Sequence, residues 1–426
     1  MKMQSVKTKI VALSVGSIVL LALAVLLVVL VQRVALQRDV LKEIDTLGRN
    51  EVTKIARDVY LMCQTQEENT QLSLASNLNV AKAQCDGLGA WRVDDSELVE
   101  WNAVNQLTKT PQSVRLPKVF LGDTWLGQNT DAAAASPVVD RVKELTGSIC
   151  TVFQRMNEAG DMLRVCTNVM KGDGSRAVGT YISAKEPDGK ANEVIATVLG
   201  GETFRGRAFV VNAWYNTVYE PLRDASGNVF GMLFVGEPQE KVEALRKGIM
   251  SVVPGKTGYV FVVGGTGDEK GVYIISKDGD GDGKGDSDGN NILDFKDTNG
   301  HEFIKSIVEK GLKLDAKAAL EKGEPIPVDY EEYPWKNKDE TVARDKIAAI
   351  AYFEPWDWVI GASVYKEDFR DAEVTVQAAI NRMIGYTLAT ALLAIAVFGL
   401  LSLTIAGRIA NPLIRATEML KDISQG

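Results

Sequence analysis

Two long uncharged segments stand at the two ends of the chain. Residues 10–31 and residues 383–406 carry no charged side chain and are rich in apolar residues. As helices rising 1.5 Å per residue, both are long enough to cross the ~30 Å hydrocarbon core of a bilayer. A cleaved signal peptide is the alternative for the first segment, but its apolar run is long and no small-residue cleavage site follows it. The pattern therefore predicts two transmembrane helices.

Positive charges lie outside these two segments, beside both ends of the chain. They are Lys2, Lys7 and Lys9 before the first segment and Arg408, Arg415 and Lys421 after the second. Cytoplasmic flanks of membrane helices are enriched in lysine and arginine. Both ends are therefore predicted to be cytoplasmic, with residues 32–382 outside the membrane. This two-span layout is typical of a transmembrane receptor.

A helical period continues beyond the first span. No proline occurs between Arg33 and Gln84, and apolar residues recur at spacings of three and four. These apolar positions are Ile55, Val59 and Met62, followed by Leu74, Leu78 and Ala81. Such spacing predicts one amphipathic helix. Fifty helical residues span roughly 75 Å, which is enough for the spine of two stacked domains.

Beyond this helix, the pattern changes to short apolar runs separated by turn residues. An irregular stretch is expected to about Asp131, followed by a short helix and then by strands. In the first half the strand-like runs are SICTVFQ, MLRVCTNV, GTYIS, RAFVVNAWYNTVYEPLR and VFGMLFVGE. In the second half they are GYVFVVGG, GVYIIS, VDYEEYPW, DKIAAIAYFEP and WVIGASVY. Each half is predicted to be an antiparallel sheet flanked by helices, so the fold class is α+β.

Composition narrows the possible functions. The 426-residue chain is 46% apolar, has a net charge of −8 and contains a single histidine, His301. An acidic chain is a poor nucleic-acid binder, and one histidine nearly excludes histidine-based metal sites and catalytic triads. The segment PGKTG at 254–258 lacks the earlier glycine of a phosphate-binding loop, because position 250 is methionine. No enzymatic activity is expected.

Several motifs in this order resemble a known family. They are GDMLRVCTNVMKGDGSRAVGTYI, GRAFVVNAWYNTVYEPLRDASGNVFGMLFVGE, GKTGYVFVV and IAYFEPWDWVIGASVYKEDF. Together they resemble the Cache 3/Cache 2 fusion family of bacterial receptors, over most of residues 33–380. The tail RIANPLIRATEMLKDISQG resembles the first helix of a HAMP domain.

The resemblance implies a fold in which the long helix carries two PAS-like (Cache) antiparallel-sheet modules between two transmembrane helices. The expected divisions are a cytoplasmic N-terminus (1–9), transmembrane helix 1 (10–31), a spine helix (32–86), a membrane-distal Cache module (87–238), a membrane-proximal Cache module (239–365), a return helix (366–382), transmembrane helix 2 (383–406) and the start of HAMP (407–426).

The resemblance also implies a function, that of the ligand-sensing input half of a receptor in the bacterial inner membrane. A methyl-accepting chemotaxis protein is the expected whole, acting as a homodimer with a cytoplasmic signalling module beyond HAMP. The alternatives are the sensor half of a histidine kinase or diguanylate cyclase, and a membrane-tethered binding protein without signalling output.

A ligand site is expected in the distal module, as the resemblance implies. A polar ligand needs a few convergent polar groups among aromatic walls. The candidates are Arg164, Arg176, Arg207, Trp214, Tyr215, Tyr219 and Trp125. The arginines favour a carboxylate-bearing ligand such as an organic acid or an amino acid. The alternative is that the aromatic residues belong to the core and the arginines are solvated or paired with Asp161 or Asp224.

An acidic run between two predicted elements of the second half resembles the start of a calcium loop. Its carboxylates are Asp278, Asp280, Asp282, Asp286 and Asp288. Alternating oxygen ligands and a glycine at the sixth position suit Ca²⁺, but the twelfth position, normally glutamate, is Gly289. A calcium site that braces this loop and a solvated insertion are both open readings.

Two cysteines are predicted to face each other across a hairpin. If SICTVFQ and MLRVCTNV pair around Glu158, Cys150 and Cys166 lie directly opposite. Either a disulfide or two free thiols is possible, and free thiols are expected because a bridge between adjacent strands is strained. Cys63 and Cys85 are ~33 Å apart on one straight helix and cannot pair.

Overall fold

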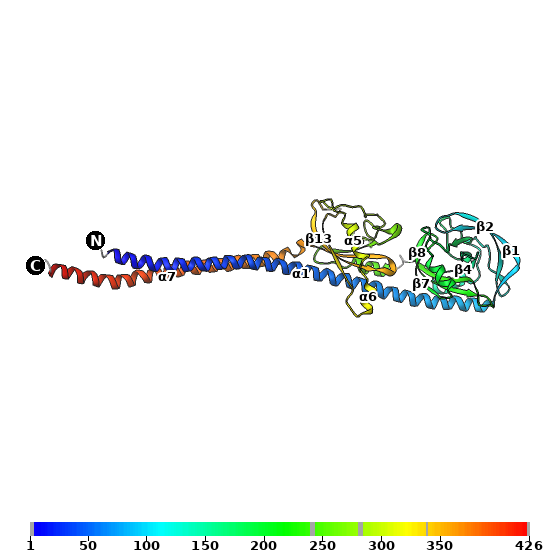
Figure 1. The fold of residues 1–426 in the computed structure, drawn as a ribbon, viewed down its shortest axis with the longest axis horizontal. Coiled ribbons are helices and arrows are strands. Elements are labelled where there is room, and N and C mark those ends of the chain that lie inside the picture. The colour runs from blue at the N-terminus through cyan, green and yellow to red at the C-terminus, as the bar shows by residue number, and fades with distance from the viewer. Residues whose placement is uncertain (1–3, 239–242, 280–283, 338–339, 424–426) are drawn as a thin grey trace.

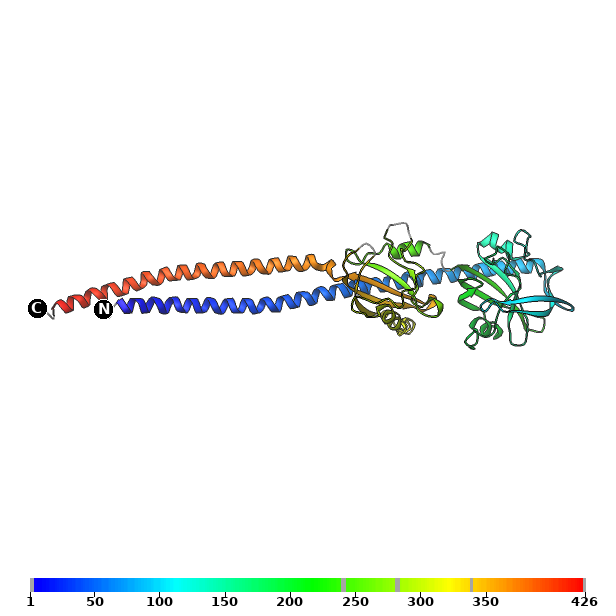
Figure 2. The same ribbon diagram turned by 90° about the horizontal axis from the view of Figure 1, so that it is seen from above.

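The computed structural model describes residues 4–238, 243–279, 284–337 and 340–423. It is an elongated α+β molecule in which two sheet modules lie one after the other along helix α1 (Gln4–Leu88). Helix α7 (Arg370–Ile423) returns beside the first half of α1, so both termini lie at one end of the molecule (Figures 1 and 2). The expected α+β fold with a long N-terminal helix and two antiparallel-sheet modules is confirmed.

The module farther from the termini, called the distal module here, contains a nine-stranded sheet in the order β3-β2-β1-β6-β5-β4-β9-β8-β7. Two short helices, α2 (Val139–Thr146) and α3 (Glu193–Leu199), flank it. The strands are β1 (Trp91–Asn105), β2 (Pro111–Leu121), β3 (Thr124–Trp125), β4 (Ile149–Arg155), β5 (Met162–Thr167), β6 (Thr180–Ile182), β7 (Phe204–Val210), β8 (Ala213–Arg223) and β9 (Val229–Pro238).

Strands β1 to β3 correct the expectation of an irregular stretch up to Asp131. Two prolines had suggested irregular structure, but the sheet accommodates both. Pro111 is the first residue of β2, a position at which strands tolerate proline. Pro117 pairs with Leu98 at the point where the β1–β2 register shifts, and such irregularities also accept proline.

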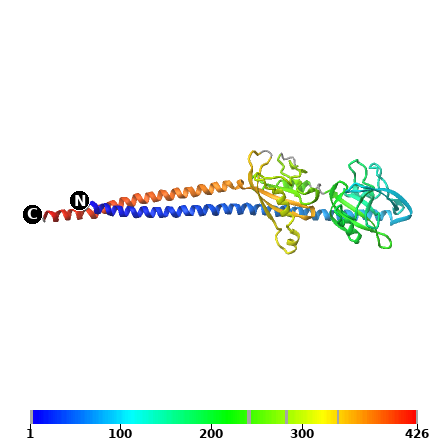
Figure 3. The ribbon, with the colours of Figure 1, turned by 45° about the horizontal axis from the view of Figure 1, so that its top comes forward.

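The other module, the proximal module, lies between the distal module and the paired helices (Figure 3). Its five-stranded sheet has the order β11-β10-β14-β13-β12. The strands are β10 (Tyr259–Gly264), β11 (Tyr273–Ile275), β12 (Asp329–Trp335), β13 (Arg344–Phe353) and β14 (Trp358–Tyr365). The helices are α4 (Glu243–Met250), α5 (Phe303–Gly311) and α6 (Ala316–Glu321), with 3₁₀ turns at Gly267–Glu269, Glu354–Trp356 and Lys366–Phe369.

Helix α1 contributes side chains to both cores, as its periodicity predicts. Val52, Ala56 and Val59 are buried in the core of the proximal module. The distal core contains Leu74, Leu78, Ala81 and Cys85 from the same helix. Because these residues recur at helical spacing, one face of α1 closes one face of each sheet.

Each sheet therefore has a second face turned away from α1. Successive strand residues point to opposite faces. In β5 the side chain of Val165 packs in the core that α1 closes, so that of Arg164 points to the other face. In β13 Ile347 packs toward α1, and Lys346 points away from it. In each module the face opposite α1 thus holds a basic side chain.

Two helical stretches among the described residues are long and apolar enough to cross a membrane. One begins at Gly16 within α1, and the other is Val374–Ile409 within α7. No residue in the most apolar window of either stretch is buried. By length and composition, this arrangement is consistent with the two predicted spans of a membrane protein.

Candidate functional site

Arg164 lies in the middle of β5, inside the distal module, and is 0% exposed. The β4–β5 hairpin places it directly opposite Phe153, and its guanidinium lies 4.9 Å from the centre of that ring. A buried arginine normally has an anionic partner. The partners of this side chain therefore decide what it does.

Two neutral side chains hold the guanidinium of Arg164. Its Nη1 donates a hydrogen bond to Thr180 Oγ1 at 2.9 Å, and its Nη2 donates one to Gln106 Oε1 at 2.8 Å. Nε has no hydrogen-bond partner, and within the described ranges no carboxylate forms an ion pair with Arg164. Burial lowers the pKa of Arg164 to about 10, so the group is still charged at neutral pH. The distal module thus buries a positive charge without a negative one.

Tyr219, on β8, supplies a second unsatisfied polar group on the same face. The residue is 0% exposed, and its hydroxyl has no hydrogen-bond partner in the described part of the chain. Burial raises the pKa of its phenol, and the nearby Arg164 charge acts in the opposite direction. Buried polar groups without partners are rare and costly in folded proteins. Two of them close together, one of them cationic, are what an anion-binding site needs.

Three aromatic rings pack around the ring of Tyr219. Its ring centre lies 4.8 Å from that of Phe234, and 6.1 Å from those of Phe153 and Phe204. These rings come from β4, β7 and β9, which the sheet order brings next to β8 and β5. The candidate site therefore combines a cation, a hydroxyl and an apolar wall. Such a combination suits a small carboxylate with an apolar body.

Gln106 is a site residue that the sequence did not reveal. It follows β1 in a stretch predicted to be irregular, 58 residues before Arg164. Its Nε2 donates to the carbonyl of Phe209 at 3.0 Å, which fixes the amide so that Oε1 faces the guanidinium. Only the pairing of β1 with β6 brings it beside β5, and no local pattern indicates that pairing.

Arg176 lies elsewhere in the distal module and forms an ion pair with a carboxylate of the chain itself. Its guanidinium makes a two-pronged contact with Asp140 of α2, both bonds at 2.8 Å, and donates to the carbonyls of Asp131, Ala134 and Thr167. This arrangement fastens α2 and the preceding loop to the sheet. Arg176 is thus a paired arginine, but its partner is Asp140, not Asp161 or Asp224 as the alternative expected.

Arg207 and Trp214 lie at the junction of the two modules. Arg207, on β7, forms an ion pair with Glu269 of the proximal module, and its Nη1 lies 3.9 Å from Asp357. Its guanidinium stacks 3.9 Å from the centre of the Trp214 ring. These contacts join the distal sheet to the 3₁₀ turns of the proximal module. The two residues are therefore placed to couple the modules.

The remaining two candidates are also apart from Arg164. Trp125 lines a narrow crevice together with Trp101 and Val165, on the face of the sheet that α1 covers. Tyr215 is half-buried on β8, where it pairs with Ala208 and Pro238. Of the seven candidate ligand residues, the structure thus brings Arg164 and Tyr219 together inside the distal module, and Arg207 and Trp214 together at the junction of the modules.

The acidic run lies in the proximal module between β11 and α5. The carboxylate of Asp288 accepts hydrogen bonds from Ser276 and from the backbone of Gly285, and forms an ion pair with Arg246. Asp286 accepts a bond from the backbone of Gly279 at 3.3 Å.

The remaining acidic candidates give no further support. Asp278 belongs to no metal-binding cluster of the described residues, and Asp280 and Asp282 lie outside those residues. Among the described residues, no three histidine, cysteine or acidic side chains are grouped to hold a metal ion. The calcium site stays a prediction.

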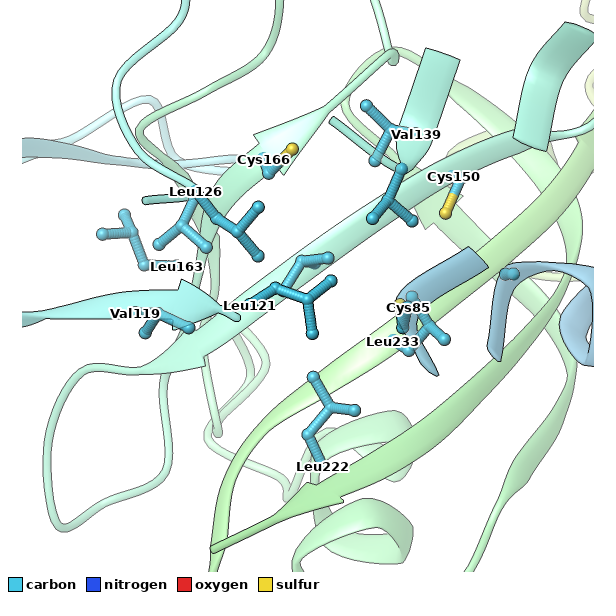
Figure 4. Packing of buried hydrophobic residues seen from close by; sticks show 14 of the residues in the cluster. Cys85, Val119, Leu121, Leu126, Val139, Cys150, Leu163, Cys166, Leu222 and Leu233 are labelled. Atoms are coloured by element: carbon cyan, nitrogen blue, oxygen red, sulfur yellow. The ribbon is translucent and has the colours of Figure 1, made fainter. Parts of the chain in front are cut away.

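The predicted face-to-face placement of Cys150 and Cys166 is wrong. Next to the turn, Arg155 pairs with Met162 and Phe153 with Arg164, which is already one residue away from the predicted register. An irregularity between Val152 and Phe153 shifts the register by one more residue, so that Cys166 pairs with Val152. Cys150 instead lies beside Asn168, whose side chain accepts a bond from its backbone nitrogen at 2.8 Å. Figure 4 shows both thiols in the core beneath α1, together with Cys85. All four cysteines of the chain are free and buried.

Several solved structures of sensor domains are similar to this chain. Among solved structures, the chain is similar to a methyl-accepting chemotaxis protein from Vibrio parahaemolyticus, with 21% identity over 30% of this chain and 70% of that one and a TM-score of 0.23. It is also similar to the sensory domain of the Campylobacter jejuni chemoreceptor Tlp3, with 9% identity over 78% and 99% and a TM-score of 0.35. A third is a Cache chemosensory domain described for carboxylic acid recognition, with 17% identity over 29% and 69% and a TM-score of 0.21.

A match to a family model covers most of the chain. The description of that family is the Cache 3/Cache 2 fusion domain, and the match extends over residues 37–379. This range contains both sheet modules and most of the part of α1 that closes them. The chain therefore belongs to the Cache 3/Cache 2 fusion family of sensor domains.

Proposed function

We propose that this chain is the ligand-sensing input half of a bacterial inner-membrane receptor, and that its distal module binds a small carboxylate at Arg164. The observation that carries the proposal is the fully buried guanidinium without a carboxylate among the described residues. An unpaired buried charge costs several kcal/mol, and a bound anion offsets that cost. Tyr219 supplies a hydroxyl for the same ligand.

The ligand must also change the balance between two states of the receptor, because a ligand that binds both equally transmits nothing. Arg207 connects the distal sheet to Glu269 in the proximal module, and the proximal sheet ends at the 3₁₀ turn that precedes α7. A displacement passing along this route would reach the second span. Helix shifts of ~1–2 Å are common in such switches.

The whole receptor is proposed to be a methyl-accepting chemotaxis protein, acting as a homodimer through a HAMP domain that begins near residue 407. A histidine kinase or diguanylate cyclase is the second candidate output, since the sensor architecture suits any of these. The role is that of a sensor without catalysis. Deleting the gene tests the output: lost swimming toward the ligand supports the chemotaxis protein, and intact swimming with altered phosphotransfer or cyclic-di-GMP points to the alternatives.

Thermal unfolding of the full chain in lipid nanodiscs tests the ligand class. A panel of organic acids, amino acids, purines and amines is compared, each at matched ionic strength. A ligand at a hundred times its Kd stabilises the folded state by about 2.7 kcal/mol, which is a clear rise in Tm. The expected result is a rise with a carboxylate and none with an uncharged analogue.

Two variants make this test specific. Arg164→Met removes the charge but keeps a long apolar side chain, so the rise in Tm on adding the ligand is expected to disappear while the protein still folds. Arg141→Met removes an exposed arginine of α2 that pairs with Glu144, and it should leave the rise unchanged. The proposal fails if Arg164→Met binds the same carboxylate with unchanged affinity.

A further inference from the structure

The proximal module buries a cation of its own that the function above does not use. Lys346, the third residue of β13, is 0% exposed, and its Nζ has no hydrogen-bond partner. No ion pair with Lys346 occurs in the part of the chain that the structure describes. Lysine is almost never fully buried without a partner. Its position therefore needs an explanation.

Tyrosine rings form the immediate surroundings of Lys346. Its Nζ lies 3.3 Å from the centre of the Tyr259 ring and 5.0 Å from that of Tyr365. Sheet register places Tyr333 of β12 and Tyr365 of β14 directly opposite it. Aromatic faces attract a cation but accept no strong hydrogen bond from it. The three N–H donors of the ammonium group are thus left without oxygen acceptors.

Nearby carboxylates are already committed to other groups. Asp368 accepts hydrogen bonds from the backbone nitrogens of Lys256 and Thr257, at 3.0 and 2.8 Å. Glu340 pairs with Arg344 and accepts a bond from the backbone of Asn337. Two further cations, Lys277 and Arg344, act on Lys346 from nearby. The surroundings are therefore short of negative charge.

Lys346 and Arg164 have similar surroundings, although their strands are not equivalent: by sheet order, β13 corresponds to β8, and β5 corresponds to β11. Each side chain lies on an inner strand of its sheet, on the face turned away from α1. Aromatic residues flank both cations, and an unsatisfied donor remains on both. Lys346 also lies near the end of its strand, one residue beyond Asp345 and close to Arg344, whose guanidinium covers the Tyr365 ring at 3.5 Å.

We infer that the proximal module contains a second anion-binding site, centred on Lys346, which takes a small carboxylate with an apolar body. The carboxylate would accept hydrogen bonds from the Nζ of Lys346, and the rings of Tyr259 and Tyr365 would contact the apolar part. This site is independent of the one at Arg164. A lysine held only for packing against tyrosine is the competing explanation.

Thermal unfolding of the full chain in nanodiscs, carried out in the Arg164→Met background, separates the two sites. The probes are potassium acetate, pyruvate and benzoate, compared with potassium chloride at equal ionic strength. At ten times its Kd, a probe should raise Tm by about 3 °C. Adding Lys346→Met should abolish the rise, whereas adding Lys305→Met, which removes an exposed lysine of α5, should not.

Hydrogen exchange locates the effect without relying on a variant. The probe should slow exchange in β13 and β10 of the Arg164→Met chain and leave β4 and β5 unchanged. The inference is overturned if no probe stabilises the Arg164→Met chain, or if Lys346→Met responds equally. Neither outcome bears on the distal site. Binding there is measured in the wild-type chain, as the rise in Tm that Arg164→Met abolishes.

Discussion

Each sheet module buries one basic side chain on the face that α1 does not cover, but the two modules use different residues. In the distal module Arg164 has two neutral hydrogen-bond partners and one aromatic ring. In the proximal module Lys346 has aromatic rings alone. Arginine keeps its charge after burial, whereas a buried lysine readily loses its proton. The buried charge is thus permanent in the distal module and titratable in the proximal module.

Replacing Arg176, which has a carboxylate partner where Arg164 has none, is expected to cause the largest loss of stability. Its substitution by methionine leaves the carboxylate of Asp140 without its buried partner and frees three backbone carbonyls. A loss of about 3–5 kcal/mol of unfolding free energy is expected. Arg164→Met, which strands no carboxylate, should cost far less or stabilise the chain. Equal losses of Tm in the two variants would contradict the assignment of a structural role to Arg176 and a ligand-binding role to Arg164.

Arg164→Lys tests what the arginine provides beyond charge. Lysine keeps a positive charge but cannot present two parallel N–H donors to a carboxylate. The affinity for the distal ligand should fall about 10–100-fold, equivalent to about 1.4–2.8 kcal/mol. Isothermal titration of the full chain measures the change. An unchanged affinity would show that charge alone holds the ligand.

The stability of the proximal module should depend on pH through Lys346. Burial lowers the pKa of this ammonium well below 10.5, and Lys277 and Arg344 lower it further, while Glu340 and Asp368 oppose them. Between the lowered pKa and 10.5, the unfolded chain holds a proton that the folded chain does not. The wild type should therefore gain about 1.4 kcal/mol per pH unit relative to Lys346→Met in that window.

Melting of the wild type and Lys346→Met between pH 6 and 10 measures this dependence. The variant should be the more stable protein in acid, and its advantage should shrink as the pH rises. Arg164→Met is the matched control: the pKa of Arg164 is lowered to about 10, so its effect should be constant below about pH 9. An advantage of Lys346→Met that grows with pH would have the wrong sign.

Calcium should produce the smallest effect, if the acidic loop binds it as predicted. A site with a Kd near 1 mM, in 1 mM Ca²⁺, contributes about 0.4 kcal/mol. Melting in Ca²⁺ and in EDTA measures the difference, with Asp286→Asn as the variant that should remove it. Identical curves in Ca²⁺ and EDTA would leave the run as a solvated insertion.

Most of the correct predictions of the fold came from long periodic patterns in the sequence. The period of α1 shows which residues enter the cores, and the turn residues separate the strands of both sheets. The β1–β3 region was missed because Pro111 and Pro117 suggested irregular structure, although the first position of a strand and a register shift accept them. The register of Cys150 and Cys166 was missed for a related reason, since no local pattern announces a β-bulge.

The sequence singles out Arg164 because an arginine inside an apolar strand is anomalous in itself, and its role as a ligand residue stays a prediction. The sequence does not separate Arg164 from Arg176 and Arg207, because the partners Asp140 and Glu269 are distant in sequence. The sequence does not single out Lys346, which directly precedes the apolar run IAAIAYF of β13. A basic residue flanked by such a run on one side is a common strand boundary, so the sequence alone gives little reason to place it inside.

The continuity of α1 through both cores also limits how such sensors can be recombined. Cys63 is the last proximal core residue of the helix and Leu74 the first distal one, eleven positions later. At about 100° per residue, eleven positions turn the helix by about 1,100°, close to three full turns. Inserting or deleting one residue here would swing one module by about 100° around the other. Chimaeras that exchange distal modules between receptors must therefore preserve this spacing, whichever loops they join.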